Sequence, residues 1–241
     1  MNAREHLETA YPYKTELHAH TKPCSPCGDI PGAEVVRIYA SLGCHSIAIT
    51  NHITPTMFLA EGAKMNAQSY LADYEEAKKE GDRIGVSVIL GAELRFTESN
   101  NDYLIYGITP EDIETLIKLI PVGIREFYKQ FKNERNLIIQ AHPFRKGCEL
   151  APLDCIDGVE TMNLHPGHNS RVAVAAQTAA KHGLIVTGGT DYHHEGHQGM
   201  CLLRTPTRLT DSYELADAIR SRDFLLDIWG NLMLPSSYPK Q

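Results

Sequence analysis

The sequence predicts an α/β fold built on a mainly parallel sheet, and three observations lead to that prediction. Short runs rich in Ile, Val and Leu alternate with amphipathic stretches, which is the pattern of strands followed by helices. The runs are apolar on both faces, as in strands that helices cover on both sides. The 241 residues are 42% hydrophobic and 22% charged, so the chain can bury one large core without disulfides.

The strands and helices are predicted in alternation, with no internal repeat or linker between them, so residues 1–241 are expected to form a single domain. Strands are expected at residues 13–20, 45–52, 86–94, 102–108, 136–143, 157–163 and 184–191. Helices are expected at residues 32–43, 69–83, 111–135, 169–183 and in the first part of 211–228, which ends in a further strand. Closed as a barrel, such a sheet would have about seven or eight strands.

Residue types at the helix ends support these boundaries. Gly43 is expected to close the first helix at its C-cap, and Ser69 is a candidate N-cap for the second. Pro121 and Gly123 are expected to break the helical stretch around residues 111–135.

The charge balance argues against several classes of partner. Twenty-three Lys and Arg against thirty Asp and Glu give a net charge of −7, which disfavours binding to duplex nucleic acid or an anionic membrane. No run approaches the roughly 20 apolar residues of a membrane span, and the first residues lack the apolar core of a signal peptide. With six scattered cysteines that read as reduced thiols, a cytoplasmic location is expected. The sequence does not indicate an oligomeric state.

Seven side chains of metal-ligand type fall at the ends of the predicted strands. They are His18, His20, His52, Glu93, His142, Asp191 and His193. In a parallel α/β barrel the carboxyl ends of the strands share one face, so these residues are expected to converge there. A single histidine beside an apolar strand is more often structural than a ligand, but seven such coincidences favour a metal site.

The residue types in this set favour a catalytic centre over a structural zinc. His18 and His20 stand two apart on a strand and therefore point to the same face, where they can share one metal or hold two. Imidazole suits Zn, Fe, Mn or Ni, and a carboxylate such as Glu93 can bridge two cations. Structural zinc sites are usually closed and rich in cysteine, whereas this set leaves room for water and substrate.

Five sequence blocks also carry a family resemblance. "ELHAHT", "AITNH", "GAEL", "QAHP" and "GGTDYHH" occur between about residues 14 and 200 in the order and spacing of the PHP (polymerase and histidinol phosphatase) superfamily, and the length resembles a stand-alone PHP domain. The resemblance implies a distorted seven-stranded β/α barrel, a (β/α)7 TIM-like fold. It also implies a centre of two or three divalent metals, usually Mn, Fe or Zn, that hydrolyses phosphoesters.

The resemblance also implies how the ligands are shared. One metal would be held by His18, His20, Glu93 and Asp191, and the second by Glu93 and His142. The third would use His52 and His193. A further ligand for the second metal is expected from "NLHPGHN", where His168 is preferred to His165; either could instead be a loop histidine, and Asn169 could cap the next helix.

Two positions depart from the pattern of the family. Asn51 stands where the family often has Asp, which puts in doubt any chemistry that needs a proton acceptor there. "CSPCGD" stands where the family often has Ser-Asp-Gly. No second Cys-x-x-Cys completes a zinc ribbon, which argues against a separate structural zinc. Because this segment contributes to the third metal in the family, the resemblance implies Cys27 as a ligand there, with Asp29 as its competitor and Cys24 as an inert thiol.

The predicted function is metal-dependent hydrolysis of a small phosphorylated metabolite or nucleotide by a metal-activated water, with Glu93 and Asp191 as the catalytic carboxylates. Arg95 and Arg145 follow two of the strand ends and are predicted to bind the phosphate, with Arg204, His194 and His197 as weaker candidates. Two alternatives remain open. One is a metal-dependent hydrolase of C–N or C–O bonds, and the other is a non-catalytic metal-binding module.

Overall fold

Two mixed six-stranded sheets form the centre of the protein, in a computed structural model that describes residues 2–235. The first sheet has the order β12 (Asn231–Met233), β11 (Leu225–Ile228), β10 (Leu202–Thr205), β1 (Tyr13–Ala19), β2 (Ser46–Ile49) and β4 (Ser87–Leu90). The second has the order β3 (His52–Ile53), β5 (Ala92–Arg95), β6 (Asp102–Tyr106), β7 (Leu137–Gln140), β8 (Gly158–Asn163) and β9 (Ile185–Gly189).

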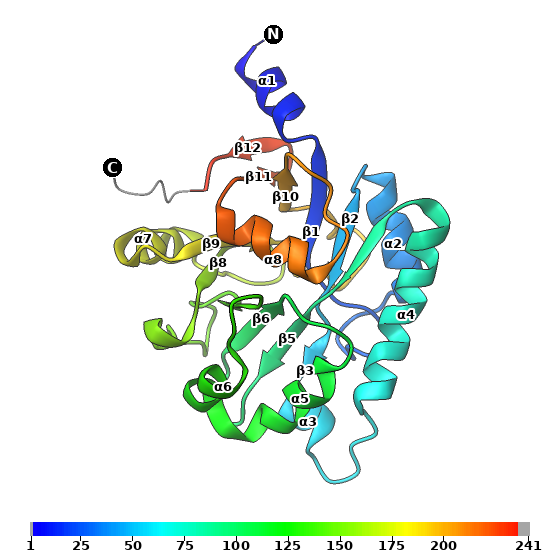
Figure 1. Cartoon of the computed structure of the whole chain (residues 1–241), viewed down its shortest axis with the longest axis vertical. Coiled ribbons are helices and arrows are strands. Elements are labelled where there is room, and N and C mark those ends of the chain that lie inside the picture. Colours follow the sequence, from blue (N-terminus) through cyan, green and yellow to red (C-terminus); the bar gives the residue numbers. More distant parts are fainter. Residues whose placement is uncertain (1, 236–241) are drawn as a thin grey trace.

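Helices surround the two sheets (Figure 1). They are α1 (Ala3–Ala10), α2 (Gly32–Ser41), α3 (Pro55–Phe58), α4 (Ala67–Ile84), α5 (Asp112–Leu119), α6 (Gly123–Phe131), α7 (Val172–His182) and α8 (Ser212–Ser221), with 3-10 turns at Ile120–Val122 and Leu153–Cys155. Helices α2 and α4 pack side by side along one flank, and α1 projects from one end of the molecule. None of the helices in residues 2–235 is long and apolar enough to cross a membrane.

The two sheets meet along two seams. At the first, the chain passes from β4 into β5 through Gly91, and the backbone ladder continues because the amide of Glu93 donates to the carbonyl of Asn51. At the second, Ala19 of β1 forms an isolated parallel bridge with Tyr192, which follows β9. The amide of Tyr192 donates to the carbonyl of His18 there. Both seams lie beside the predicted site residues.

The prediction of a mainly parallel sheet is wrong, because antiparallel pairs are as common as parallel ones among the described strands. Strand β6 runs antiparallel to both β5 and β7. Only residues 96–101 separate β5 from β6, which is too short for the crossover that a parallel neighbour needs. The amino end of β6 therefore lies beside the carboxyl ends of β5 and β7.

Several local predictions need correction. Asn66, not Ser69, is the N-cap of α4, and Ser69 occupies the third position of a capping box with it. Arg171, not Asn169, precedes α7 as its N-cap. Leu42, not Gly43, is the C-cap of α2, and Gly43 follows it with a φ of 73°. The stretch around 111–135 does break at Pro121 and Gly123. The sequence patterns did not reveal α1, α3, β10 and β12.

Candidate metal centre

The seven residues predicted at strand ends lie around one cleft of about 300 Å³ or directly beneath it. Three groups among residues 2–235 bring three ligand atoms within 4.8 Å of one another. They are His20 with His52 and His193, His18 with His20 and Asp191, and Glu93 with Asp102 and His142. The first two groups share His20, and Glu93 of the third group lies 3.3 Å from Nε2 of His20, so the three groups are neighbours.

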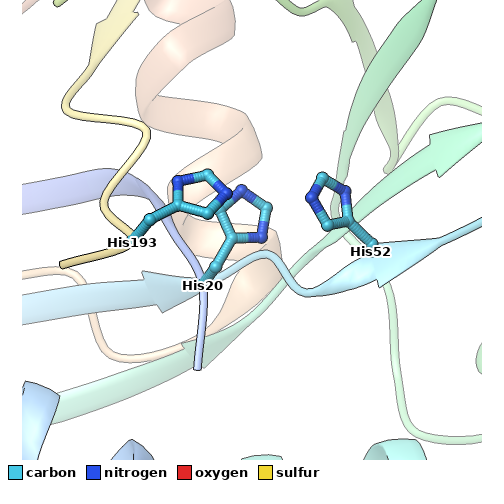
Figure 2. A group of neighbouring side chains, drawn as sticks. All are labelled: His20, His52 and His193. Carbon is cyan, nitrogen blue, oxygen red and sulfur yellow. The ribbon is translucent and has the colours of Figure 1, made fainter. Parts of the chain in front are cut away.

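The first group joins three imidazoles that come from separate parts of the chain. His20 follows β1, and His193 follows β9. His52 was predicted to end a strand over residues 45–52, but β2 ends at Ile49 and His52 begins the separate short strand β3. The ring of His20 lies 4.2 Å from that of His52 and 4.3 Å from that of His193, measured between centroids. Figure 2 shows the three rings gathered in one place, with His52 facing the other two.

Glu93 lies between four of the imidazoles. Its Oε1 lies 3.4 Å from Nε2 of His18 and 3.1 Å from Nε2 of His142. Its Oε2 lies 3.3 Å from Nε2 of His20 and 2.8 Å from Nδ1 of His52. The carboxylate is 1% exposed, so both of its oxygens are committed to the interior of the cluster.

Asp191 and Asp102 supply the other carboxylates of the three groups. Oδ1 of Asp191 lies 3.3 Å from Nε2 of His20 and 3.5 Å from Nε2 of His18. Oδ2 of Asp102 lies 3.8 Å from Nε2 of His142. Asp102 was not predicted as a site residue. It stands at the amino end of β6, which the antiparallel direction of that strand brings to the edge of the cleft.

The buried polar atoms of this cluster fit divalent cations. Nε2 of His18, Nε2 of His20, Nδ1 of His52 and Oε2 of Glu93 have no well-aligned hydrogen-bond partner among the described residues. An unsatisfied buried polar atom costs about 1–3 kcal/mol, so four of them in one place are unfavourable unless something binds them. Imidazole nitrogens and carboxylate oxygens are ligands of Zn, Mn and Fe, so such cations would satisfy all four.

Two further buried residues orient the cluster, and sequence reasoning did not find either. Oε1 of Glu160, in β8, lies 2.9 Å from Nδ1 of His18, which leaves Nε2 of that ring facing Glu93. Asn163, at the end of β8, donates from Nδ2 to Oε2 of Glu160 at 2.9 Å and to Oδ2 of Asp191 at 3.2 Å. A carboxylate behind a histidine is the usual support of a metal ligand.

The electrostatics show strong mutual stabilisation of charge. Burial would raise the pKa of Glu93, but the charges of His18 and His52 outweigh it and hold that pKa well below its usual range. Burial would likewise lower the pKa of His18, but Glu160, Asp191 and Glu93 raise it well above its usual range. Glu93 is therefore ionised at neutral pH, as a cation ligand must be.

Two of the candidate ligands have unusual backbone conformations. His142 has a φ of 30° and Asp191 a φ of 55°, and non-glycine residues rarely adopt this left-handed region. Each such residue costs about 1–3 kcal/mol, and such strain clusters at functional sites. The surrounding hydrogen bonds hold both residues in place, including the amide of His142 that donates to Glu160 at 3.1 Å.

The predicted phosphate-binding arginines both line the cleft, but each already has a carboxylate partner. Arg145 donates from Nη2 to Oδ2 of Asp191 at 2.5 Å, and Arg95 makes two bonds to Asp102 at 2.6 and 2.7 Å. Nε of Arg145 has no partner among the described residues. Arg204 lies elsewhere, because it pairs with Asp227 at 2.7 Å in a separate cleft.

The predicted third-metal ligands Cys27 and Asp29 are placed differently. Cys27 lines the cleft and remains exposed, whereas Asp29 accepts from Nδ1 of His194 at 2.6 Å. His165 and His168 line the rim, and neither belongs to the three ligand groups of residues 2–235. Burial lowers the pKa of His165 to about 4, so its ring is neutral at pH 7.

Cys27 is expected to react as a thiolate at unusually low pH. Partial burial would raise its pKa, but hydrogen bonds with His193 and His52 outweigh burial and lower the pKa from 9.0 to about 6. The thiolate is the reactive form, so the rate of alkylation of Cys27 by iodoacetamide in metal-free protein should reach half its maximum near pH 6. Peptide mass spectrometry across a pH series measures that rate at Cys27 separately from the other cysteines.

His193→Ala is the matched variant for this prediction, since it removes one hydrogen-bond partner and should move the midpoint to higher pH. A midpoint near 9 in the unchanged protein would show that the two histidines do not act on this thiol. Protection of Cys27 by added Zn²⁺ would indicate that the thiolate binds the cation, and alkylation at an unchanged rate would argue against its role as a ligand.

The two sheets of mixed strand direction and their helices define an α/β protein. The cleft of buried imidazoles and carboxylates gives it a candidate metal centre. The chain belongs to the PHP domain family, whose model matches residues 16–229. The family resemblance predicted from five sequence blocks is therefore confirmed. No curated protein matches the chain significantly.

Two solved structures share the fold at low sequence identity. One is a two-domain protein from Bacteroides vulgatus, described as containing a predicted PHP-like metal-dependent phosphoesterase, with 14% identity and a TM-score of 0.64. The match covers 89% of this chain and 64% of the Bacteroides chain, so this chain spans less than two thirds of that relative. The other is PsfC from Pseudomonas syringae, with 15% identity, a TM-score of 0.59, and coverage of 86% and 87%.

Proposed function

We propose that the protein is a metal-dependent phosphoesterase that hydrolyses a small phosphorylated metabolite or nucleotide. The observation that carries the proposal is Glu93, a buried carboxylate within 3.4 Å of nitrogens of four imidazoles, three of which have no well-aligned hydrogen-bond partner among the described residues. Membership of the PHP domain family supports it, as does the phosphoesterase description of the Bacteroides relative. As part of the proposal, residues 1–241 form one domain, and the two seams close its sheets into a distorted seven-stranded barrel.

The proposed cation ligands follow the three groups of the cleft. One cation would be held by His18, His20, Glu93 and Asp191, and a second by Glu93, Asp102 and His142 with His168 at the rim. A third would be held by His52 and His193 with Cys27. The third set lies beside the first, because the ring centroid of His20 lies within 4.3 Å of those of both His52 and His193.

Divalent cations bound there would lower the pKa of a coordinated water toward 7 and offset the charge of phosphoryl oxygens. The residues of the chain supply position and charge. Both oxygens of Glu93 and Oδ1 of Asp191 face imidazole nitrogens, and Oδ2 of Asp191 accepts from Arg145, so these carboxylates are placed to hold cations rather than to take up a proton. The two carboxylates therefore act by fixing charge.

The size and charge of the cleft favour a small substrate with one phosphoryl group. About 300 Å³ lies at the lower end of small-molecule sites. Its arginines, Arg95 and Arg145, are each paired with a carboxylate, which leaves little positive charge for a second phosphate. Nε of Arg145 remains available to a phosphoryl oxygen.

A net charge of −7 disfavours duplex nucleic acid as a partner. A cytoplasmic location is also proposed, consistent with six unpaired cysteines in the described chain.

Metal content and substrate screening test the function directly. Protein purified without added metal should carry more than one equivalent of Zn, Mn or Fe per chain by inductively coupled plasma mass spectrometry. It should hydrolyse small phosphomonoesters or phosphodiesters, lose that activity to a chelator, and regain it with one of these cations. Activity on amides or carboxylic esters without activity on any phosphoester would favour a C–N or C–O hydrolase. Full metal occupancy without any turnover would favour a non-catalytic module.

A further inference from the structure

Asn51, which stands where the family often has Asp, does not line the cleft, and its side chain is fully hydrogen-bonded. Its Oδ1 accepts from the amide of Thr21 and from Oγ of Ser25, both at 2.8 Å. Its Nδ2 donates to Oγ1 of Thr21 at 2.7 Å and to Oδ2 of Asp73 at 2.8 Å. Thr21, Ser25 and Asn51 are fully buried, and Asp73 of α4 is 3% exposed. The amide uses both of its donors and both acceptor directions.

The orientation of this amide follows from the backbone. The N–H of Thr21 can only donate, so the atom facing it must be Oδ1 of Asn51, and Nδ2 must face Asp73. Oδ1 has no proton, so Ser25 must donate its single hydroxyl proton to it. Donor and acceptor roles are thus fixed as far as Ser25.

The position of the Ser25 hydroxyl proton also determines which ring nitrogen of His20 is protonated. With its proton given to Asn51, Oγ can only accept from its two remaining neighbours, the amide of His52 at 3.1 Å and Nδ1 of His20 at 3.3 Å. Nδ1 of His20 must therefore carry the ring proton. Nε2 is left with a lone pair, and it lies 3.3 Å from both Oε2 of Glu93 and Oδ1 of Asp191 with no hydrogen-bond partner in the described chain.

We propose that Asp73 is a positioning residue: together with the backbone N–H of Thr21 it holds the amide of Asn51 in this orientation, and Asn51, through Ser25, fixes His20 as the Nδ1–H tautomer and so presents Nε2 to a cation. The relevance of the tautomer to a cation rests on the proposed function, but the tautomer itself does not. The arrangement accounts for the amide at position 51. An aspartate there would place a second carboxylate oxygen about 2.8 Å from Oδ2 of Asp73, where Nδ2 now donates, and like charges at that distance repel.

An exchange of the two side chains tests the pairing. Asn51→Asp alone should weaken the affinity for Zn²⁺, measured by competition with a chromophoric chelator, by about 10- to 100-fold, the usual effect of disturbing the support of a metal ligand. Adding Asp73→Asn should bring affinity back to within about threefold of the unchanged protein, because an amide again faces a carboxylate. A double variant no better than Asn51→Asp would overturn the pairing.

Ser25→Ala tests the tautomer in metal-free protein and needs no enzyme activity. Nitrogen-15 NMR of the His20 ring at neutral pH should show Nδ1 protonated in the unchanged protein and a population of Nε2–H in Ser25→Ala. Ser41→Ala, at an exposed serine of α2 whose hydroxyl donates to the carbonyl of Ile38, is the matched control. Nε2–H in the unchanged protein, or an unchanged ring in Ser25→Ala, would overturn the proposal. Absence of any cation binding with the expected NMR result would instead contradict the proposed function alone.

Discussion

Glu93→Gln is expected to lower both metal content and phosphoesterase activity by more than about 100-fold. Loss of a residue that only supports a metal ligand costs up to about 100-fold, and Glu93 is proposed as a ligand itself. The amide has nearly the same volume, so packing is preserved. It removes the charge that lowers the free energy of the surrounding imidazoles and cations, and it replaces one oxygen by an NH2 donor. That donor would face the nitrogens of His20 and His52, or those of His18 and His142 after a flip of the amide.

Metal per chain and turnover are measured in parallel for this variant, with circular dichroism to verify folding. Glu61→Gln, at an exposed glutamate, removes a charge without touching the cleft and should leave both quantities unchanged. Retention of full activity by Glu93→Gln would remove Glu93 from the centre of the proposed site.

Gly189→Ala is expected to destabilise the protein by about 1–3 kcal/mol, the range for overpacking a filled interior, and to abolish cation binding. A methyl group at Gly189 of β9 would lie 2.6 Å from Cβ of His18 and 2.9 Å from Oε1 of Glu160. It would also lie 3.3 Å from the backbone nitrogen of His18, so a rotation of the imidazole alone gives no relief. Strand β1 must move, and with it the ring that Glu160 holds.

Urea denaturation and metal analysis of the same preparations measure both effects. Gly28→Ala is the matched control, because a methyl group there meets no atom closer than 3.4 Å and the residue does not have a positive φ. It should leave stability and metal content unchanged or raise stability slightly. Equal stability of Gly189→Ala and the unchanged protein would mean that β1 and β9 yield more easily than the packing indicates.

The convergence of the candidate ligands could be predicted from the sequence because it depends on one regularity, the shared edge of parallel strands. His18, His20 and His142 follow or end their strands as expected, and Asp191 follows β9. Asp102 escaped the same reasoning because it begins a strand. Only the antiparallel direction of β6 brings that amino end to the shared edge, and the direction is set by a connection too short for a crossover.

The supporting residues could not be predicted for a different reason. Glu160 lies within β8, and Asp73 lies on the buried face of α4, 52 residues from the threonine to which it bonds. Neither position has a distinctive spacing from a ligand in sequence, because the contact depends on how the strands and helices pack. The sequence signal that does exist is chemical. A carboxylate at a position that faces the protein interior indicates that a hydrogen-bond donor from another element must lie beside it.

The seams between the two sheets also have a mechanical consequence. His18 and His20 extend from one sheet and Glu93 from the other, so any ion that they bind in common would cross-link the two sheets. Loss of the ion would then weaken the contact between the two sheets as well as abolish activity. A chelating agent would therefore lower the free energy of unfolding of this chain.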